Sequence, residues 1–226
     1  MSSTQPIANL FQSSESLMEI QDAMQWWHQR RSLRSDQQAA EIRHHLLQEL
    51  FSLRRSLELA NSNADQHQQW LGKVEGLQRS LENLSHQLAP PYLEASLSLA
   101  LQFAIEQWKV QHPEIQFEMH STHSQQQDSL EHNRVILEVL NEWLRLNLPV
   151  CDLAIALNHQ GNDHTLMLQV NYADAEKLEA TLKSVEVQYL SRVFELLISG
   201  KTEVKQQGQR AVWYFFWKGE SPSLSA

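Results

Sequence analysis

The chain is poor in the residues that most often build covalent frameworks and phosphate sites. Its 226 residues include one cysteine, Cys151, and only 6 glycines and 6 prolines. A single thiol excludes an internal disulfide framework and a cysteine-rich zinc site. No glycine lies between Gly161 and Gly200. A backbone that wraps closely around a phosphate usually needs glycine, because positive φ and close approach cost little only there.

Long apolar runs and an excess of positive charge are also missing. No apolar run approaches the roughly 20 residues that a membrane span needs, and residues 1–6 lack the basic-then-apolar pattern of a signal peptide. The formal net charge of -9 opposes sequence-independent binding to nucleic acid phosphates. With 42% hydrophobic and 20% charged residues, the composition is typical of a globular protein. We expect a cytoplasmic protein that binds neither membranes nor nucleic acid.

The first half of the chain predicts a helical hairpin. A polar tail and a helical pattern at 14–34 precede Ser35 and Gln38, whose spacing resembles a capping box that begins a new helix. Apolar residues at helical spacing then form a first stripe: Ile42, Leu46, Leu50, Leu53, Leu57 and Ala60. After turn-rich residues 61–65 comes a second stripe: Trp70, Val74, Leu77, Leu81, Leu84 and Leu88. The prolines at 90 and 91 end the second helix.

Both stripes are continuous, and two antiparallel helices bury only one stripe each against one another. Pairing two such hairpins into a four-helix bundle would bury the remaining apolar width. We therefore expect a homodimer through residues 36–89. The alternative is a hairpin that packs only on the C-terminal half of its own chain.

The second half alternates between helical and strand patterns. Helices are expected at about 92–111, 129–147 and 174–199, and a half-exposed strand at 115–120. Two strand hairpins are expected, at 152–158 with 164–171 and at 202–205 with 210–217. This order predicts an α+β sandwich with helices on one face of a mixed sheet. The expected divisions are 1–34 for the tail and first helix, 35–91 for the hairpin, 92–218 for the sandwich and 219–226 for a C-terminal tail.

The segment Leu88-Ala-Pro-Pro-Tyr-Leu93, together with the frame Leu46, Gln48 and Leu50, resembles the two-component sensor histidine kinases. More narrowly, it is similar to the branch paired with response regulators that carry helix-turn-helix output domains. The resemblance covers residues 36–218. It implies a dimerisation and phosphotransfer hairpin followed by an ATP-binding domain.

Several functional positions depart from that resemblance. Arg43 stands at the phosphoacceptor position, and His44 replaces the neighbouring acid. In the asparagine box Glu138 is kept, but Glu142 stands where the magnesium-binding asparagine belongs. A shift of one residue would bring in Asn141, on another face of the helix.

Asn171-Tyr172-Ala173 replaces the Asp-x-Gly that grips adenine, and the glycine-rich lid is missing. The resemblance therefore implies a kinase-like shape with no ATP cofactor and no kinase activity.

Three functions stay open. The first is a regulator that binds a receiver domain or a sensor kinase through the hairpin surface at Arg43, Gln48, Phe51, Arg54 and Arg55. The second is a histidine phosphotransfer protein that uses His44 or His45, because an imidazole nitrogen is nucleophilic near neutral pH. The third is a kinase with residual ATP-dependent activity.

A metal site is not expected. The pair His120 and His123 has a suggestive spacing, but it lies in a polar stretch with no nearby cysteine and no evident third ligand. No sensor domain is recognisable before the hairpin, so the input signal is expected to arrive through a binding partner.

Overall fold

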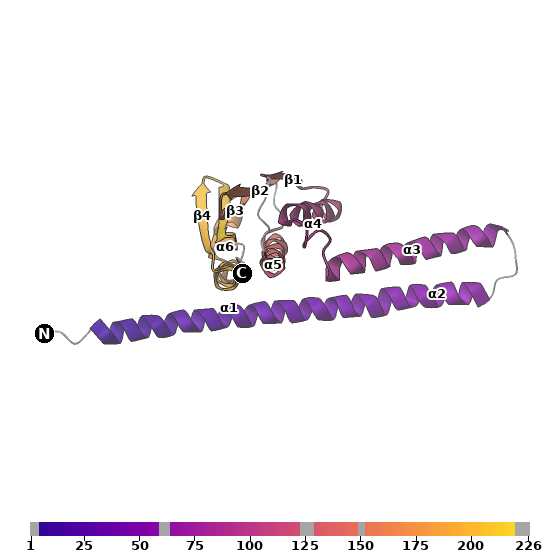
Figure 1. Cartoon of the computed structure of the whole chain (residues 1–226), viewed down its shortest axis with the longest axis horizontal. Helices are drawn as coiled ribbons and strands as arrows, with labels where there is room; N and C mark the ends of the chain where they lie inside the picture. The colour runs from indigo at the N-terminus through magenta and orange to yellow at the C-terminus, as the bar shows by residue number, and fades with distance from the viewer. Residues whose placement is uncertain (1–4, 59–63, 123–128, 149–151, 220–226) are drawn as a thin grey trace, which may run out of the picture. The chain divides into compact units, whose positions relative to one another are not determined.

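The computed structural model describes residues 5–58, 64–122, 129–148 and 152–219, with side chains placed from Leu17 onward except at 41, 43, 45, 57, 58, 64–67, 69, 83 and 87. Figure 1 labels the elements along the chain. The chain divides into two compact units. The hairpin unit is His28–Pro91, and the α/β unit combines the residues up to Trp27 with those from Tyr92 onward.

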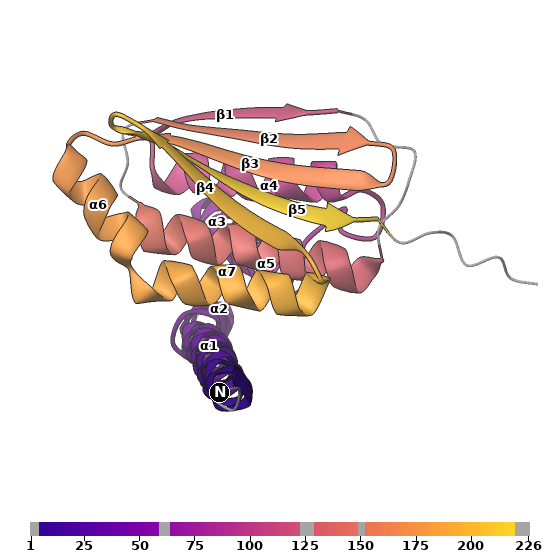
Figure 2. The ribbon, with the colours of Figure 1, turned by 90° about the vertical axis from the view of Figure 1, so that its left-hand side faces the viewer.

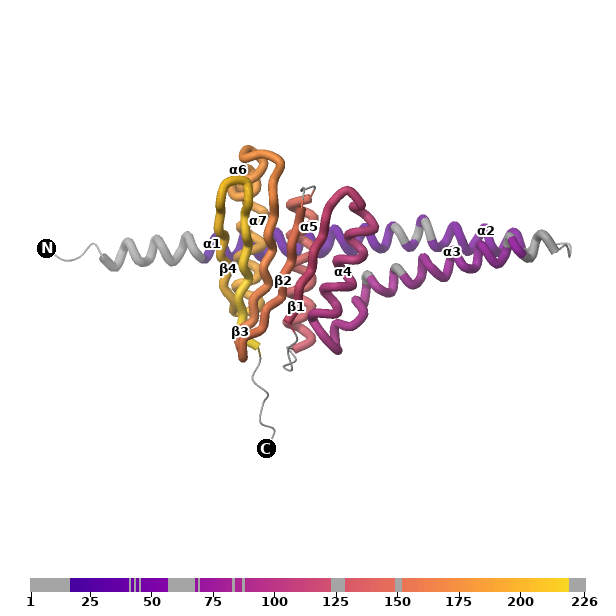
Figure 3. Tube along the Cα trace, turned by 90° about the horizontal axis from the view of Figure 1, so that it is seen from above, coloured from indigo at the N-terminus to yellow at the C-terminus, as the bar shows by residue number. Residues whose placement is uncertain are grey.

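In the hairpin unit, the chain passes from α1 (Gln5–Glu41) through a single π-helical turn, η1 (Ile42–Leu46), into α2 (Leu47–Glu58). The helix α3 (Ala64–Leu88) returns beside α2 (Figures 1 and 3). Between the two helices, Lys73 on α3 donates hydrogen bonds to Ser52 (3.3 Å) and Ser56 (2.5 Å) on α2.

The prediction that a new helix begins at Ser35 is wrong. The helix α1 runs through Ser35 without a break, because no proline or glycine lies between Trp27 and Glu41 and a cap requires an extended backbone at the capping residue. Most of the polar tail expected before residue 14 is helical, since α1 already begins at Gln5. Leu57 and Ala60 of the predicted first stripe lie outside the described side chains.

The α/β unit confirms the expected α+β architecture. Its helices are α4 (Leu97–Gln111), α5 (Leu130–Asn147), α6 (Ala175–Lys183) and α7 (Val185–Ile198). Its strands are β1 (Gln116–Ser121), β2 (Asp152–Gln160), β3 (Asp163–Asn171), β4 (Lys201–Gln207) and β5 (Arg210–Lys218), in the order β1-β2-β3-β5-β4. The β1–β2 pair is parallel and the other pairs are antiparallel. Figure 2 shows α4, α5 and α7 under one face of the sheet.

The helix expected at 174–199 is divided at Ser184. The backbone of Ser184 is extended (φ -61°, ψ 125°). Its N–H donates to the carbonyl of Thr181, and its hydroxyl accepts the N–H of Val187 at 3.4 Å. One serine therefore ends α6 and begins α7. This side-chain bond competes with the helical backbone bonds that the periodic pattern alone predicts.

Alternation along the strands sets the two faces of the sheet. Trp213 and Phe215 of β5 are buried under the helices, where Trp143 of α5 and Phe194 of α7 meet them. The intervening residues point to the other face, as period-two geometry requires. There Tyr214 and Phe216 stack with a ring-centroid distance of 5.8 Å and are half-buried.

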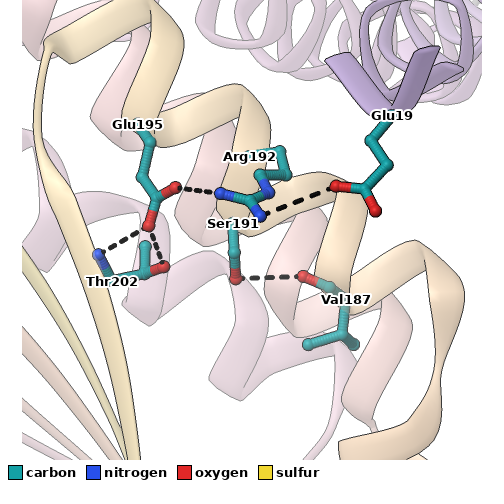
Figure 4. A network of polar contacts seen from close by, with 6 residues as sticks. All are labelled: Glu19, Val187, Ser191, Arg192, Glu195 and Thr202. Carbon is teal, nitrogen blue, oxygen red and sulfur yellow. Dashed lines mark hydrogen bonds and ion pairs between the residues drawn. The ribbon is translucent and has the colours of Figure 1, made fainter. Parts of the chain in front are cut away.

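The N-terminal helix contributes to this core. Ala23 and Trp27 are buried in it, and Trp26 lies against Tyr189 of α7 with ring centroids 6.1 Å apart. Glu19 forms an ion pair with Arg192 of α7 at 3.7 Å (Figure 4). The segment 1–34, expected to stand apart, is thus divided at Trp27 between the two units.

Replacing the buried indole tests this role of α1. Trp27→Ala should lower the free energy of unfolding of the α/β unit by about 3–5 kcal/mol, the usual cost of deleting a buried aromatic side chain. Leu17→Ala is the matched control, because Leu17 lies on the same helix and is 65% exposed. Urea unfolding followed by tryptophan fluorescence measures both. Equal effects of the two substitutions would contradict the placement of Trp27 in the core.

Candidate functional site

The expected phosphoacceptor positions coincide with the π-helical turn. Arg43, His44 and His45 all lie within η1 (Ile42–Leu46). The side chain of His44 is exposed, while those of Arg43 and His45 lie outside the described side chains. A π-turn adds one residue to a helical turn and is frequent at functional sites. The spacing of four between Ile42 and Leu46 fits an ordinary α-helix, so the sequence did not indicate this turn.

The other candidate partner-binding residues lie together on α2. Gln48, Phe51 and Arg55 recur at helical spacing and are exposed, with exposed Arg54 beside them. The ring of Phe51 is 67% exposed. The hairpin unit thus presents an aromatic ring flanked by two cations. Such a surface suits an apolar contact with an acidic rim.

A second set of exposed side chains on the hairpin unit is aliphatic. Leu46 is buried, and Leu53, Leu77 and Leu84 are half-buried. Three other members of the two predicted stripes are 47% to 50% exposed: Leu50, Val74 and Leu81. Leu88, at the end of α3, is 62% exposed. One hairpin therefore buries only part of its apolar width.

In the α/β unit, the asparagine-box positions are engaged in contacts with neighbouring side chains. The side-chain oxygen of Asn141 accepts the indole N–H of Trp108 on α4 at 2.8 Å. Arg145 lies over the same indole at 6.0 Å. Because its oxygen is already bound to Trp108, Asn141 holds α4 and α5 together.

Glu142, which stands at the magnesium-ligand position, is 2% exposed. One of its carboxylate oxygens lies 3.3 Å from a guanidinium nitrogen of Arg145. The positive charge of Arg145 stabilises this buried carboxylate. Glu138, the retained box residue, is half-buried one turn earlier on α5.

The middle position of the segment expected to bind adenine holds a packed tyrosine. Tyr172 is 6% exposed, and its ring lies 6.3 Å from that of Trp213. Trp143 of α5 meets the same indole edge-on at 5.1 Å. Burial raises the pKa of Tyr172 to about 12, so its hydroxyl stays protonated at neutral pH. The carboxylate that the resemblance implies for binding the adenine amino group is replaced by the amide of Asn171, directly before Tyr172.

The segment after Tyr172 leads directly into a helix. Asp174 caps α6 by accepting the N–H of Lys177 at 2.7 Å. Asn171 accepts a bond from Arg210 and donates one to Asp152, which ties the ends of three strands together. The residues present at these positions therefore do not fit Mg·ATP, because they offer neither the adenine carboxylate, nor a free asparagine oxygen, nor glycine for a lid.

A polar network that was not expected from the sequence lies at the junction of α1, α7 and β4. Glu195 lies 3.2 Å from Arg192, which in turn pairs with Glu19. The carboxylate of Glu195 also accepts both the backbone N–H (3.1 Å) and the hydroxyl (2.7 Å) of Thr202 (Figure 4). Arg192 and Glu195 are a local (i, i+3) pair on α7, whereas long-range packing brings Glu19 and Thr202 to them, which no local pattern could have indicated.

Two expected absences concern metals and membranes. Within the described ranges, no group of three or more metal-ligating side chains is placed to hold an ion. Both His123 and Cys151 lie outside those ranges. Over the same part of the chain, no helix is long and apolar enough to cross a membrane.

No family model and no curated protein matches the chain. Solved structures do match. The Acinetobacter baumannii histidine kinase AdeS is 12% identical, with 79% of this chain and 98% of that chain covered and a TM-score of 0.41. A histidine kinase from Burkholderia phymatum is 14% identical (83% and 99% covered, TM-score 0.44). The histidine kinase ThkA in complex with the response regulator protein TrrA is 12% identical (85% and 64% covered, TM-score 0.44).

The likeness of this chain to these histidine kinases is one of fold, and at such identities and TM-scores it assigns a role to no residue of this chain.

Proposed function

We propose that the protein is a cytoplasmic binding regulator of two-component signalling that has lost kinase activity. It acts as a homodimer and docks a response-regulator receiver domain or a sensor kinase on α2. The observation that carries the proposal is Asn171, which stands where the resemblance implies an adenine-binding carboxylate and is hydrogen-bonded to Arg210 and Asp152. With Asn141 bound to Trp108 and Glu142 beside Arg145, the positions that would hold nucleotide serve packing instead.

The exposed aliphatic stripe supports the homodimer. Leu50 on α2 and Val74, Leu81 and Leu88 on α3 would be covered if two hairpins formed a four-helix bundle. Residues 74, 81 and 88 are separated by seven, the spacing of a coiled-coil seam. The hairpin of a second copy carries the same spacing and is therefore the proposed partner of this seam.

The exposed ring and cations of α2 support the partner. A receiver domain carries an acidic pocket, which Arg54 and Arg55 would attract, while Phe51 supplies the apolar anchor of the interface. This regulator needs no cofactor, because binding alone changes which proteins reach the receiver.

A charge in the aliphatic stripe tests the homodimer. Leu81→Glu should give a monomer, because two carboxylates would be buried at the seam of the bundle without partners. Gln68→Glu adds the same charge at an exposed position of α3 outside the stripe and should leave a dimer. Sedimentation velocity measures both, with circular dichroism as the check on helix content. A wild-type monomer at tens of micromolar, or identical behaviour of the two variants, would contradict the bundle.

Removal of the exposed ring tests the docking surface. Among purified receiver domains from the same genome, we expect at least one to bind the full chain in biolayer interferometry. Phe51→Ala should weaken that binding by about 30-fold, the effect of losing a hot-spot side chain. Leu33→Ala is the control, since Leu33 is 56% exposed elsewhere on the hairpin unit. The docking proposal fails if no receiver or kinase binds, or if both variants bind equally.

A second candidate function, phosphotransfer through His44, is favoured by the exposure of this side chain within η1. A phosphoryl group would leave the aspartyl oxygen of a receiver as its P–O bond breaks and form an N–P bond with the imidazole. If this function operates, phosphate from a labelled receiver appears on the wild-type chain and on His28→Ala, which alters another exposed histidine. It does not appear on His44→Ala. Labelling of His44→Ala at the wild-type level would exclude His44 as the acceptor.

A further inference from the structure

The strand β4 forms an open edge of the sheet. It is the last strand in the order β1-β2-β3-β5-β4 and pairs with β5 from Lys201 to Gln207 without interruption. The backbone N–H of Thr202 donates to the side chain of Glu195, so it points away from β5. In an antiparallel ladder both polar groups of a residue point to the same side, and the side alternates. Thr202, Val204 and Gln206 therefore present their backbone groups to the edge.

The side chains of this edge are complementary to themselves. In an antiparallel pair of β4 strands centred on Val204, each Glu203 lies opposite Lys205 of the other strand, and the two Val204 side chains lie opposite one another. Val204 is 43% exposed, although it faces the helix side of the sheet with the buried Trp213 opposite it. Opposite charges and apolar pairs directly across two strands are both stabilising.

Neighbouring registers lack this complementarity. Centring the pair on Glu203 places Glu203 against its own copy and Lys201 against Lys205. Centring it on Lys205 places two lysines together. Lysine on an edge strand usually opposes pairing, but in the register centred on Val204 the lysine at 205 meets a carboxylate. A hydrogen bond from Lys201, followed by the charges of Lys201 and Lys205, holds the pKa of Glu203 below its usual value.

We propose that a second copy of this chain pairs with β4 in antiparallel orientation about a two-fold axis at Val204, joining two five-stranded sheets into one continuous sheet. The two Val204 residues exchange N–H to C=O bonds, and each Gln206 N–H binds the Thr202 carbonyl of the other copy. The bond from Thr202 N–H to Glu195 is kept (Figure 4). This interface is separate from the bundle of hairpins and gives the homodimer a second way to associate.

Cysteine cross-linking tests the register. In a Cys151→Ser background, Val204→Cys places two thiols on residues whose Cα atoms would be about 5.5 Å apart in the paired edge, within the range that a disulfide spans. Gln206→Cys is the matched control, because the two copies of residue 206 would be four residues apart, roughly 13 Å. We expect oxidation to cross-link Val204→Cys and not Gln206→Cys. Equal cross-linking of the two variants, or none, would overturn the proposal.

Charge exchange tests the complementarity. Glu203→Lys added to the Val204→Cys chain should slow cross-linking by about tenfold, since like charges then face one another twice. The double change Glu203→Lys with Lys205→Glu should restore the rate, because the two opposite-charge pairs return in exchanged positions. Failure of the double change to restore cross-linking would count against this register.

The test is independent of the hairpin bundle. Adding Leu81→Glu to the Val204→Cys chain removes the proposed association of hairpins and leaves the β4 edge intact. Cross-linking should persist in that variant at raised protein concentration. Loss of cross-linking at every concentration would show that the edge does not associate by itself and would overturn the proposal.

Discussion

The contact on which the α/β unit depends is the packing of Tyr172 and Trp143 against Trp213. The three rings join the end of β3, the helix α5 and the central part of β5, with ring centroids 5.1 and 6.3 Å from that of Trp213. Aromatic side chains of this size bury more apolar surface than most core residues. Tyr172 directly follows Asn171, the position at which the resemblance to histidine kinases implies the adenine-binding carboxylate. Under the proposed function, the packing that stabilises the fold also involves the segment that would contact adenine.

The polar positions on α5 make further contacts within the α/β unit. Asn141 binds Trp108 and so attaches α4 to α5, and the buried carboxylate of Glu142 lies beside Arg145. On α7, Arg192 pairs with Glu19 of α1, and Glu195 accepts the hydroxyl of Thr202 on β4. Through these contacts the N-terminal helix and the last strand pair are held to the same helical layer, and the edge of β4 is held in a defined position.

Much of the architecture could be predicted because it depends on local periodicity. The alternation in β3 and β5, the two helical stripes and the break at Pro90 each identify an element from its own residues. The placement of Trp27 could not be predicted, because a helical stripe shows that a face is apolar but not which surface covers it. The same holds for the order of β4 and β5 in the sheet, which depends on long-range pairing. The division at Ser184 depends on one hydroxyl bond that competes with the helix.

At the candidate site, the changes at Glu142 and Asn171 could be identified from residue type alone, whereas the burial of Glu142 and the bond between Asn141 and Trp108 required the structure. We propose that the contacts of these residues leave no site for Mg·ATP. Isothermal titration of the full chain with Mg·ATP, alongside an active histidine kinase as positive control, is the decisive measurement. We expect no binding heat at millimolar nucleotide. Saturable binding with a stoichiometry of one per chain would contradict it.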